Sequence, residues 1–195
     1  MMWPWRRRDR YLSRPVRSKR FDLVPCGVAD AFNISWRWTR DPEILVNLTF
    51  DASPRTRVGW FREIERPDNR DTFTHAIIPR GGRKVIGLHR IKLVPYRTAS
   101  AEIAVHDRAW WGRDVFFETR SALMNHFFAS ERVEKFQALV HTRNFPSVFN
   151  YKKLGYRCAG TLRRARYDPV SETRFDFFIF EMLHDEWEAG KDAGK

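Results

Sequence analysis

The chain contains little cysteine, and this scarcity bears on the compartment in which it works. Its 195 residues include only Cys26 and Cys158, which lie far apart in the sequence. They provide neither a disulfide framework nor a Cys-x-x-Cys pair, which is typical of a reducing compartment. We therefore predict a cytoplasmic protein.

Long apolar runs are also missing. No stretch approaches the roughly 18 apolar residues that a membrane-spanning helix requires. The first twenty residues, MMWPWRRRDRYLSRPVRSKR, have no apolar core after their arginines, which excludes a secretory signal. No His-Glu-x-x-His or similar metal-binding spacing occurs, so we expect no metal.

Acidic residues are scarce relative to basic ones, and the imbalance is uneven. The chain has 36 Lys and Arg against 24 Asp and Glu, a net charge of +12. Residues 1–20 hold seven Arg, one Lys and one Asp, which is +7 and leaves +5 for residues 21–195. We predict a basic, flexible tail over 1–20, one domain over 21–187 and a short C-terminal tail over 188–195.

The composition of the N-terminal segment leaves its partner open. Trp3, Trp5 and Tyr11 alternate with arginines there, which suits an anionic membrane surface or an acidic partner. A disordered start and an Arg-rich transit peptide are the alternatives. Because the rest of the chain is only mildly basic, we do not expect nucleic acid as a partner.

The full chain is 43% hydrophobic and 15% aromatic, enough for one folded domain with a core. Apolar spacing predicts alternating helices and strands, and the wide apolar stripe of the helix after residue 114 predicts packing against a sheet. The order predicts an α+β (mixed α/β) fold with helices on the sheet's faces. The expected elements are helices over 30–40, opened by Asp30, and 56–66; a hairpin around Gly81-Gly82; a strand over 100–107; the helix from Val115; a strand over 135–142; a short helix over 145–155; and strands over 156–168 and 173–183.

The stretch WWGRDVFFETR, residues 110–120, joins a predicted strand to a predicted helix. A helix N-terminus entered from a tight loop favours anions, because its free N–H groups and its dipole both attract negative charge. Such loops usually carry several glycines, whereas this one has only Gly112 and places Asp114 near the expected phosphate position. The segment therefore indicates a phosphate site with an unusual loop.

Several further motifs occur in a characteristic order. Asn144, Ser147 and Tyr151 precede Lys153-Leu154-Gly155-Tyr156, and upstream Ala101-Glu102-Ile103 precedes Trp111-Gly112-Arg113. Gly160-Thr161-Leu162-Arg163 and Asp185-Glu186-Trp187 follow. Together these motifs resemble the GNAT N-acetyltransferase superfamily, in particular its branch of ribosomal-protein and small-molecule amine acetyltransferases, over roughly residues 21–187.

The resemblance implies a central mixed, mostly antiparallel sheet with splayed parallel strands and helices on both faces. It also implies an acyl-CoA-dependent N-acyltransferase, with acetyl-CoA as donor and a primary amine as acceptor. The pyrophosphate would lie on the helix from Val115, the pantetheine arm would pair with the backbone of residues 103–105, and Asn144 would touch that arm. The implied donor-binding residues are Ile103, Ala104, Val105, Arg108, Gly112, Arg113, Asp114, Val115, Phe116, Asn144 and Ser147.

The reaction needs a base for the amine and an acid for the leaving thiolate. Tyr151 is our candidate acid, because a phenol stays protonated at neutral pH; Ser147 is the second. Glu102 is the candidate base, directly or through water, and His106 is a weaker one. Each of these residues also has a purely structural interpretation. Tyr151 could be a core tyrosine and Ser147 a residue of the first helical turn. Glu102 could be an exposed strand residue and His106 a structural histidine.

At the loop's three family-specific positions the chain has Trp111, Asp114 and Phe116, a departure at each. Phe116 removes a place where backbone could approach phosphate, and Asp114, as an N-cap, would compete for the same N–H groups. Arg108 and Arg113 could compensate with charge-assisted bonds. We therefore predict a weakened or altered donor site.

Two other functions remain open. The altered loop also fits a longer acyl-CoA or acyl carrier protein, an acidic partner, as donor. A non-catalytic module that binds nucleic acid or a membrane through residues 1–20 is the other alternative. The acceptor is not identified; an arginine-rich strand could favour an anionic one or simply be solvated, and its arginines are Arg157, Arg163, Arg164 and Arg166.

Overall fold

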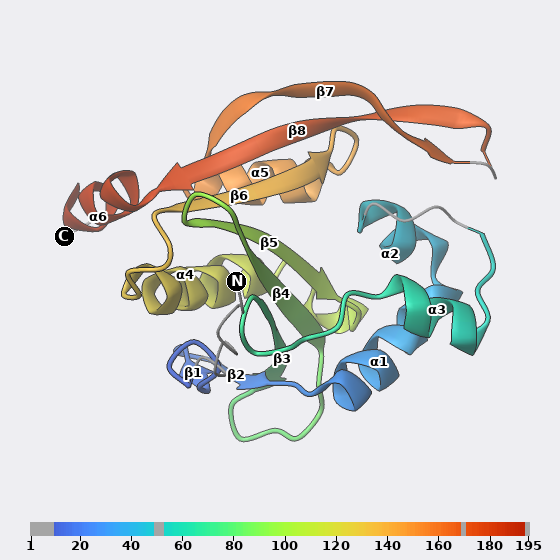
Figure 1. The fold of residues 1–195 in the computed structure, drawn as a ribbon, viewed down its shortest axis with the longest axis horizontal. Helices are drawn as coiled ribbons and strands as arrows, with labels where there is room; N and C mark the ends of the chain where they lie inside the picture. Colours follow the sequence, from blue (N-terminus) through green and yellow to red (C-terminus); the bar gives the residue numbers. More distant parts are fainter. Residues whose placement is uncertain (1–9, 49–52, 169–170, 194–195) are drawn as a thin grey trace, which may run out of the picture.

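The computed structural model describes residues 10–48, 53–168 and 171–193 (Figure 1). Its centre is an eight-stranded sheet in the order β1-β2-β3-β4-β5-β6-β8-β7, in which β5 and β6 are parallel and the other pairs antiparallel. This confirms the mixed, mostly antiparallel sheet. The strands are β1 (Val16–Arg17), β2 (Phe21–Pro25), β3 (Thr72–Pro79), β4 (Gly87–Val94), β5 (Thr98–Val105), β6 (Lys135–His141), β7 (Arg157–Asp168) and β8 (Thr173–Leu183).

The helices match most of the predicted segments, with different starts. Gly27, not Asp30, is the N-cap of the first helix, and Asp30 lies in its first turn. The Thr56 side chain caps the third helix by accepting a 3.0 Å bond from the Gly59 N–H. The helices are α1 (Val28–Trp36), the 3₁₀ turn η1 (Arg37–Arg40), α2 (Pro42–Asn47), α3 (Arg57–Glu63), the 3₁₀ turn η2 (Arg108–Trp110), α4 (Val115–Phe128), α5 (Phe145–Lys153) and α6 (His184–Ala193).

Helices cover both faces of the sheet, as the sequence predicts. On one face, Leu123 and Phe127 of α4 and Tyr151 of α5 pack in a large core with apolar side chains of β2 to β6 and β8. On the other face, Ala31 of α1 and Trp38 of η1 belong to a smaller cluster with residues of β3, β4 and β5. The central strands β3, β4 and β5 therefore supply side chains to both cores.

The parallel strands β5 and β6 separate soon after they pair. Their register covers three pairs, from Thr98–Lys135 to Ser100–Gln137. Beyond these, β5 stays with β4 as far as Val105 and β6 stays with β8 as far as His141. Figure 1 shows the two strands running apart, which confirms the splayed parallel strands.

The ends of the chain extend the predicted domain. Leu12 is fully buried, and the Tyr11 ring stacks on His126 at 4.8 Å. Residues 10–20 are therefore packed on the domain and are not a free tail, whereas residues 1–9 lie outside the described part. At the other end, residues 184–193 form α6, whose Trp187 indole donates to Asn125 at 2.9 Å.

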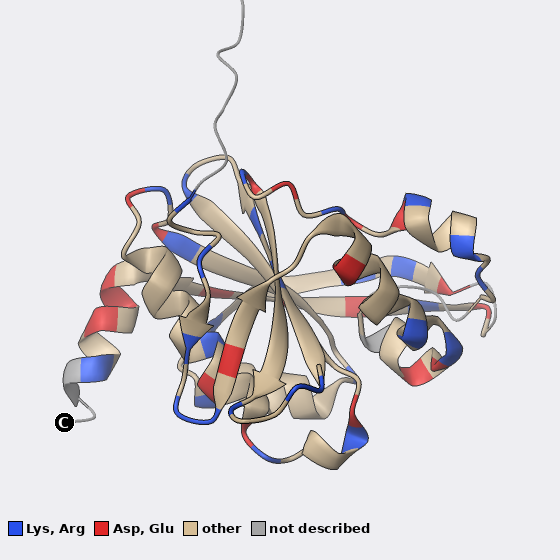
Figure 2. Ribbon diagram, turned by 90° about the horizontal axis from the view of Figure 1, so that it is seen from below, with Lys and Arg blue, Asp and Glu red and all other residues tan. Residues whose placement is uncertain are grey.

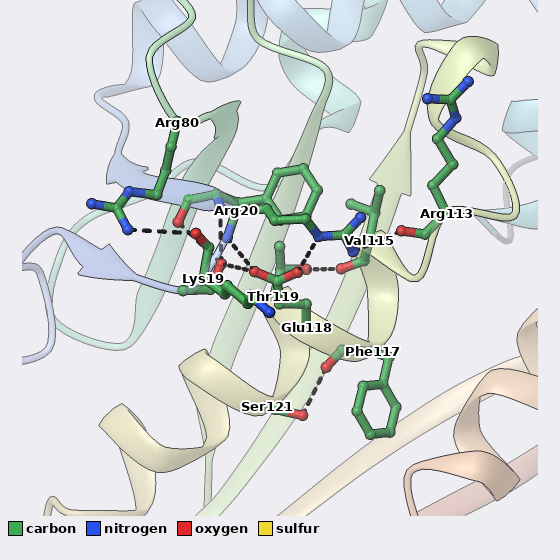
Figure 3. A network of polar contacts seen from close by, with 11 residues as sticks. Lys19, Arg20, Arg80, Arg113, Val115, Phe117, Glu118, Thr119 and Ser121 are labelled. Carbon is green, nitrogen blue, oxygen red and sulfur yellow. Dashed lines mark hydrogen bonds and ion pairs between the residues drawn. The ribbon is translucent and has the colours of Figure 1, made fainter.

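The β1–β2 segment is also tied to the start of α4. The Ser18 hydroxyl donates to Glu118 Oε1 at 2.7 Å, and Arg20 Nε donates to Glu118 Oε2 at 2.7 Å (Figure 3). A further bond of 2.9 Å runs from Arg20 Nη2 to the Arg113 carbonyl. The N-terminal segment therefore fixes the loop and first turn that the sequence predicts as a phosphate site.

Basic and acidic residues interleave over the described helices, strands and loops (Figure 2). None of the helices in the described ranges is long and apolar enough to cross a membrane. Within the same ranges no group of three or more His, Cys, Asp or Glu side chains is arranged to hold a metal ion.

Candidate active site

A cleft of about 750 Å³ lies where β5 and β6 separate. It is bounded by β5, the loop before α4, the start of α5 and residues of α2. Most of the predicted donor-binding residues line it: Ile103, Ala104, Val105, Gly112, Asp114, Val115, Phe116, Asn144 and Ser147. The splay of two strands thus brings together segments that are about forty residues apart in the sequence.

One wall of the cleft is the backbone of β5 beyond its pairing with β6. Backbone groups of a strand point alternately to its two neighbours. The Arg97 and Ala101 carbonyls accept bonds from the β6 and α5 side, at 2.7 and 3.4 Å. The His106 N–H, by contrast, donates to Ile86 beside β4 at 2.9 Å. Odd-numbered residues of this strand therefore face the cleft with their backbone groups.

This alternation of backbone groups along β5 refines the predicted contact of the pantetheine arm with residues 103–105. Ile103 presents both its N–H and its carbonyl to the cleft, and Val105 presents its N–H. The Val105 carbonyl is already bonded by the Trp111 indole N–H, at 2.7 Å. Ala104 pairs with Leu88 on the β4 side, so its backbone does not face the cleft and only its side chain does.

The loop before α4 presents free N–H groups to the cleft. Asp114 adopts a left-handed conformation (φ 54°, ψ 21°), and the Glu118 N–H closes the first turn on its carbonyl at 3.0 Å. The N–H groups of Val115, Phe116 and Phe117 precede that turn, where a helix leaves its donors without intrahelical partners. The geometry of an anion site is therefore present although the loop has one glycine.

The Asp114 side chain does not cap α4, which corrects the prediction. It forms no capping hydrogen bond. Instead its Oδ1 atom accepts a 2.8 Å bond from Lys153 Nζ at the end of α5, and this bond lowers the pKa of Asp114. Asp114 thus leaves the helix donors free but neutralises a lysine at the cleft.

Phe116 also differs from its expected effect. Its side chain is only 8% exposed, and its ring meets the Tyr151 ring edge-on at 4.8 Å. The ring therefore points into the core between α4 and α5, so its bulk does not shield the backbone N–H from the cleft.

The two arginines expected to compensate do not line the cleft. Arg108 Nη2 binds Asp41 at 2.8 Å and Glu43 at 2.9 Å, and its guanidinium lies 4.5 Å from the Trp111 ring centre. The Arg113 guanidinium lies 5.9 Å from the ring of Trp110. In Figure 3 the Arg113 side chain extends away from the Glu118 network.

Sequence analysis missed a different arginine. Arg143 lines the cleft from the connection between β6 and α5, one residue before Asn144. Its position beside a predicted donor-binding asparagine is the signal that could have found it. Arg143 lines the cleft directly, and Lys153 lies beside it, bound to the cleft residue Asp114.

A smaller hollow of about 40 Å³ continues the cleft between the splayed strands and is lined by Glu102, Asn144, Ser147 and Tyr151, among others. The structure thus gathers all three predicted catalytic residues around one space. Asn144 caps α5, because its Oδ1 accepts the Ser147 N–H at 3.1 Å. Ser147 is half-buried in the first turn and lines both the cleft and the hollow.

Tyr151 is 4% exposed, and its hydroxyl donates to the Ala101 carbonyl at 3.4 Å. Arg120 Nη2 donates to the same hydroxyl at 3.3 Å. Burial raises the pKa of Tyr151 above its ordinary value, and Arg120 partly opposes that rise. The phenol is therefore protonated at neutral pH and can donate a proton.

Glu102 forms an ion pair with Arg90 of β4 through its Oε2 atom. Arg90 also pairs with Glu65, at 3.4 Å. Glu102 lies between the inner hollow and a second hollow of about 40 Å³, which is lined by apolar side chains that include Trp38 and Trp60. It is placed to receive a proton from a group entering on that side.

His106 does not line the cleft or either hollow. Its ring centre lies 6.2 Å from that of Trp38, and burial lowers its pKa. The structure therefore favours the structural alternative for this histidine.

The Asp114–Lys153 pair yields a prediction about donor affinity. Asp114→Asn removes the negative charge and frees Lys153 for a phosphate, and because the pair is exposed we expect CoA to bind roughly two- to fivefold more tightly. Asp114→Gly should match or exceed this gain, because glycine adopts the left-handed conformation without steric cost. Calorimetric titration with CoA measures both. Equal or weaker affinity in the Asn variant would contradict the assignment of this loop to phosphate.

Comparisons with known proteins agree with this geometry. Residues 20–157 match the family model of the acetyltransferase (GNAT) domain. The uncharacterized N-acetyltransferase p20 of Bacillus licheniformis is 23% identical over 176 residues, which cover 87% of this chain and 96% of that protein.

Solved structures show the same fold. A GNAT-family acetyltransferase from Bacillus anthracis superposes with a TM-score of 0.70 at 16% identity, covering 88% of this chain and 99% of that one. The ribosomal L7/L12 α-N-protein acetyltransferase RimL, solved in complex with coenzyme A, gives a TM-score of 0.71 at 12% identity, covering 88% and 99%.

Proposed function

The chain belongs to the acetyltransferase (GNAT) family, and we propose that it transfers an acetyl group from acetyl-CoA to a primary amine by direct attack. Acyl transfer to an amine is the chemistry of this family. The observation that carries the proposal is a cleft that extends from the α4 N-terminus along the free edge of β5 and adjoins the hollow lined by Glu102 and Tyr151, with Ile103, Asn144 and Ser147 lining both.

The cleft has groups suited to each part of a CoA molecule. The N–H groups of residues 115–117 would bind the pyrophosphate, with Arg143 nearby and Lys153 available if it leaves Asp114. The backbone of Ile103 and the Val105 N–H would pair with the amides of the pantetheine arm. This arrangement would bring the thioester to the gap between β5 and β6.

Around that gap the side chains can handle both protons of the reaction. Glu102 would accept the amine proton through Oε1, directly or through water, because Arg90 holds the other oxygen. Tyr151 would donate its hydroxyl proton to the leaving sulfur. Ser147, which lines the same hollow, is the alternative acid.

The acceptor would approach from the opposite face of the sheet. The hollow there shares Glu102 and Ile103 with the inner hollow, and its other walls are mainly apolar, with Trp38 and Trp60 among them. An amine attached to an apolar or aromatic group fits these walls. Glu65 and Glu102 line the hollow together with Arg90, which pairs with both carboxylates, so the Oε1 atom of Glu102 is the group left to meet the amine.

A longer or protein-bound acyl donor is the second candidate, and exposed aromatic side chains at α5 favour it. Phe145 and Phe149 are 71% and 66% exposed, and Phe149 lines the cleft. Such rings could contact an apolar chain or the surface of a carrier protein. Medium-chain acyl-CoA and acyl carrier protein are therefore compared with acetyl-CoA in the tests of donor binding.

Thermal unfolding with CoA tests the donor site. At about 100 times its dissociation constant, CoA should raise the free energy of unfolding by roughly 2.7 kcal/mol. Ile103→Pro is the matched variant, because it removes an N–H that faces the cleft and not the β4 ladder, and its stabilisation by CoA should be smaller. No stabilisation of the wild-type protein at millimolar CoA would contradict the proposal, and equal stabilisation of both proteins would contradict the assignment of this cleft.

A further inference from the structure

Arg120 of α4 is a fully buried guanidinium among apolar side chains. Burial of an unpaired charge is costly. Across the described ranges 10–48, 53–168 and 171–193, no carboxylate forms an ion pair with Arg120, and its Nε and Nη1 atoms have no hydrogen-bond partner. Such an expensive arrangement calls for a compensating role.

The position of Arg120 in the helix strengthens this argument. Phe116, Leu123 and Phe127 lie four residues before, three after and seven after it, on the stripe of α4 that faces the core. An aliphatic side chain would satisfy the pattern at this position. Breaks in such a pattern are expected at functional sites.

Arg120 donates a hydrogen bond to the candidate acid, and it also lies close enough to the buried Tyr156 hydroxyl to lower the pKa of that phenol against the effect of burial. The Nη2 atom of Arg120 donates to the Tyr151 hydroxyl at 3.3 Å, and its guanidinium carbon lies 5.7 Å from the Tyr151 ring centre and 5.4 Å from that of Phe116. The same hydroxyl donates to the Ala101 carbonyl. The Tyr151 oxygen is thus held between a cation and a carbonyl, with its ring at the inner hollow.

We propose that Arg120 is a positioning residue that orients the Tyr151 hydroxyl and stabilises the phenolate formed when Tyr151 acts as the acid. The inference rests on the proposed function. The amine nitrogen forms a bond to the thioester carbon, and the C–S bond breaks with its electron pair going to sulfur. The Tyr151 O–H bond then breaks, its proton goes to sulfur and its electron pair stays on the phenolate. The proton accepted by Glu102 restores the phenol.

The groups around Tyr151 are consistent with this role. Glu102 of β5 adds a negative charge, Tyr156 after α5 meets the Tyr151 ring edge-on at 4.9 Å, and β8 contributes only the stacked ring of Phe180. Arg120 is therefore the cation that opposes burial and Glu102 at this hydroxyl.

On the other side of Arg120 the neighbouring titratable groups are neutral. His89 of β4 is fully buried and pairs with Thr119 at 2.8 Å. Burial lowers its pKa well below the ordinary value, and Arg120 lowers it further. His75 of β3 is also buried with a lowered pKa, so neither histidine neutralises or duplicates the charge of Arg120.

A double-mutant cycle tests the proposal. Arg120→Met, which keeps most of the apolar volume, should lower kcat about ten- to hundredfold, the usual value of a hydrogen bond to a charged group. The KM for donor should change little. In a Tyr151→Phe background the same substitution should cost little further, because its partner is gone. Arg120→Lys should restore part of the lost kcat.

The matched control uses Tyr156, which is also buried and also interacts with Arg120 but does not line the inner hollow; its hydroxyl donates to Met124 Sδ at 3.3 Å. In a Tyr156→Phe background, Arg120→Met should still cost its full factor. The proposal would be overturned if Arg120→Met lowered kcat as much in the Tyr151→Phe background as in the wild-type background, or if it did not lower kcat in the wild-type background. Thermal unfolding of each variant identifies any that fail to fold. If Arg120→Met fails to fold, the cycle is run with Arg120→Lys. Its smaller loss of kcat should again vanish in the Tyr151→Phe background.

A second readout does not depend on turnover. In a pH titration followed by ultraviolet absorbance, the part of the absorbance change that Tyr151→Phe abolishes reports the ionisation of Tyr151. Arg120→Lys or Arg120→Met should shift this part of the change to higher pH, because a cation near the phenol is weakened or removed. An unchanged or lowered pKa of Tyr151 would overturn the inference even if the protein transfers no acyl group. Absence of acyl transfer by the wild-type protein together with the expected pKa shift would instead contradict only the proposed function.

Discussion

Tyr151→Phe should lower kcat by about 10²–10⁴-fold, the usual contribution of a general acid. The substitution removes one oxygen and its proton while keeping the ring, which stacks on Phe180 at 5.3 Å and meets Phe116 edge-on. The KM for donor should change little, because Tyr151 lines the inner hollow and not the cleft proposed for CoA. Steady-state kinetics with acetyl-CoA and a panel of amines measures the effect.

The loss should be separable from a loss of stability. Without the hydroxyl, Arg120 and the Ala101 carbonyl lose a partner, which costs about 1–3 kcal/mol for a buried group. Tyr156→Phe removes a buried hydroxyl that does not line the hollow, so it should lower stability but leave kcat within a few-fold. If Tyr151→Phe keeps its turnover, the acid is Ser147 or solvent, and Ser147→Ala decides between them.

Elements with long apolar periodicity could be predicted well, and the shorter ones could not. The apolar pattern repeats over many residues in the helix from Val115 and in the hairpin around Gly81-Gly82, and the structure contains both elements. The helical segment predicted over 30–40 does end at Arg40, but Pro42 begins a further short helix, α2, that the sequence analysis did not predict. Proline suits both the end of one helix and the start of the next, because its missing N–H is tolerated at the first residue of a helix.

The position of the backbone that we propose for donor binding could be predicted, because it depends on the local order of elements. A strand, a loop and a helix start follow one another over residues 101–117, and the splay of β5 from β6 leaves Ile103 facing the cleft. The partners of the charged side chains were not predictable, because they depend on tertiary neighbours. Asp114 pairs with Lys153, 39 residues away, and Arg108 pairs with Asp41, 67 residues away.

A buried arginine illustrates the same limit. Arg120 looks like a solvated residue when the helix is considered alone, because charged side chains rarely occupy core positions. Only the placement of α5 and β5 around α4 shows that it is fully buried beside Tyr151. The sequence signal was its spacing from Phe116 and Leu123, which identifies the face but not the neighbour.

Deletion of residues 1–20 should lower the free energy of unfolding by at least about 2–5 kcal/mol, the typical effect of losing one fully buried leucine side chain. The deletion removes Leu12, the Tyr11–His126 stack and the pairing of β1 with β2. Natural domains are stable by only about 5–15 kcal/mol, so this is a large fraction. Chemical unfolding of the full chain, the deletion and Leu12→Ala measures it, and a deletion as stable as the full chain would contradict the packing of residues 10–20.

The same deletion should also weaken CoA binding, because Ser18 and Arg20 hold Glu118 in the first turn of α4 and Arg20 holds the Arg113 carbonyl (Figure 3). Arg20→Ala should reproduce part of this loss, since it removes the side-chain bonds and leaves β1 and Leu12 in place. Deletion of residues 1–9 alone keeps every one of these contacts, so it should leave CoA affinity unchanged and lower binding to anionic vesicles. Equal CoA affinity in Arg20→Ala and the full chain would show that the N-terminal segment supports the fold but not the phosphate site.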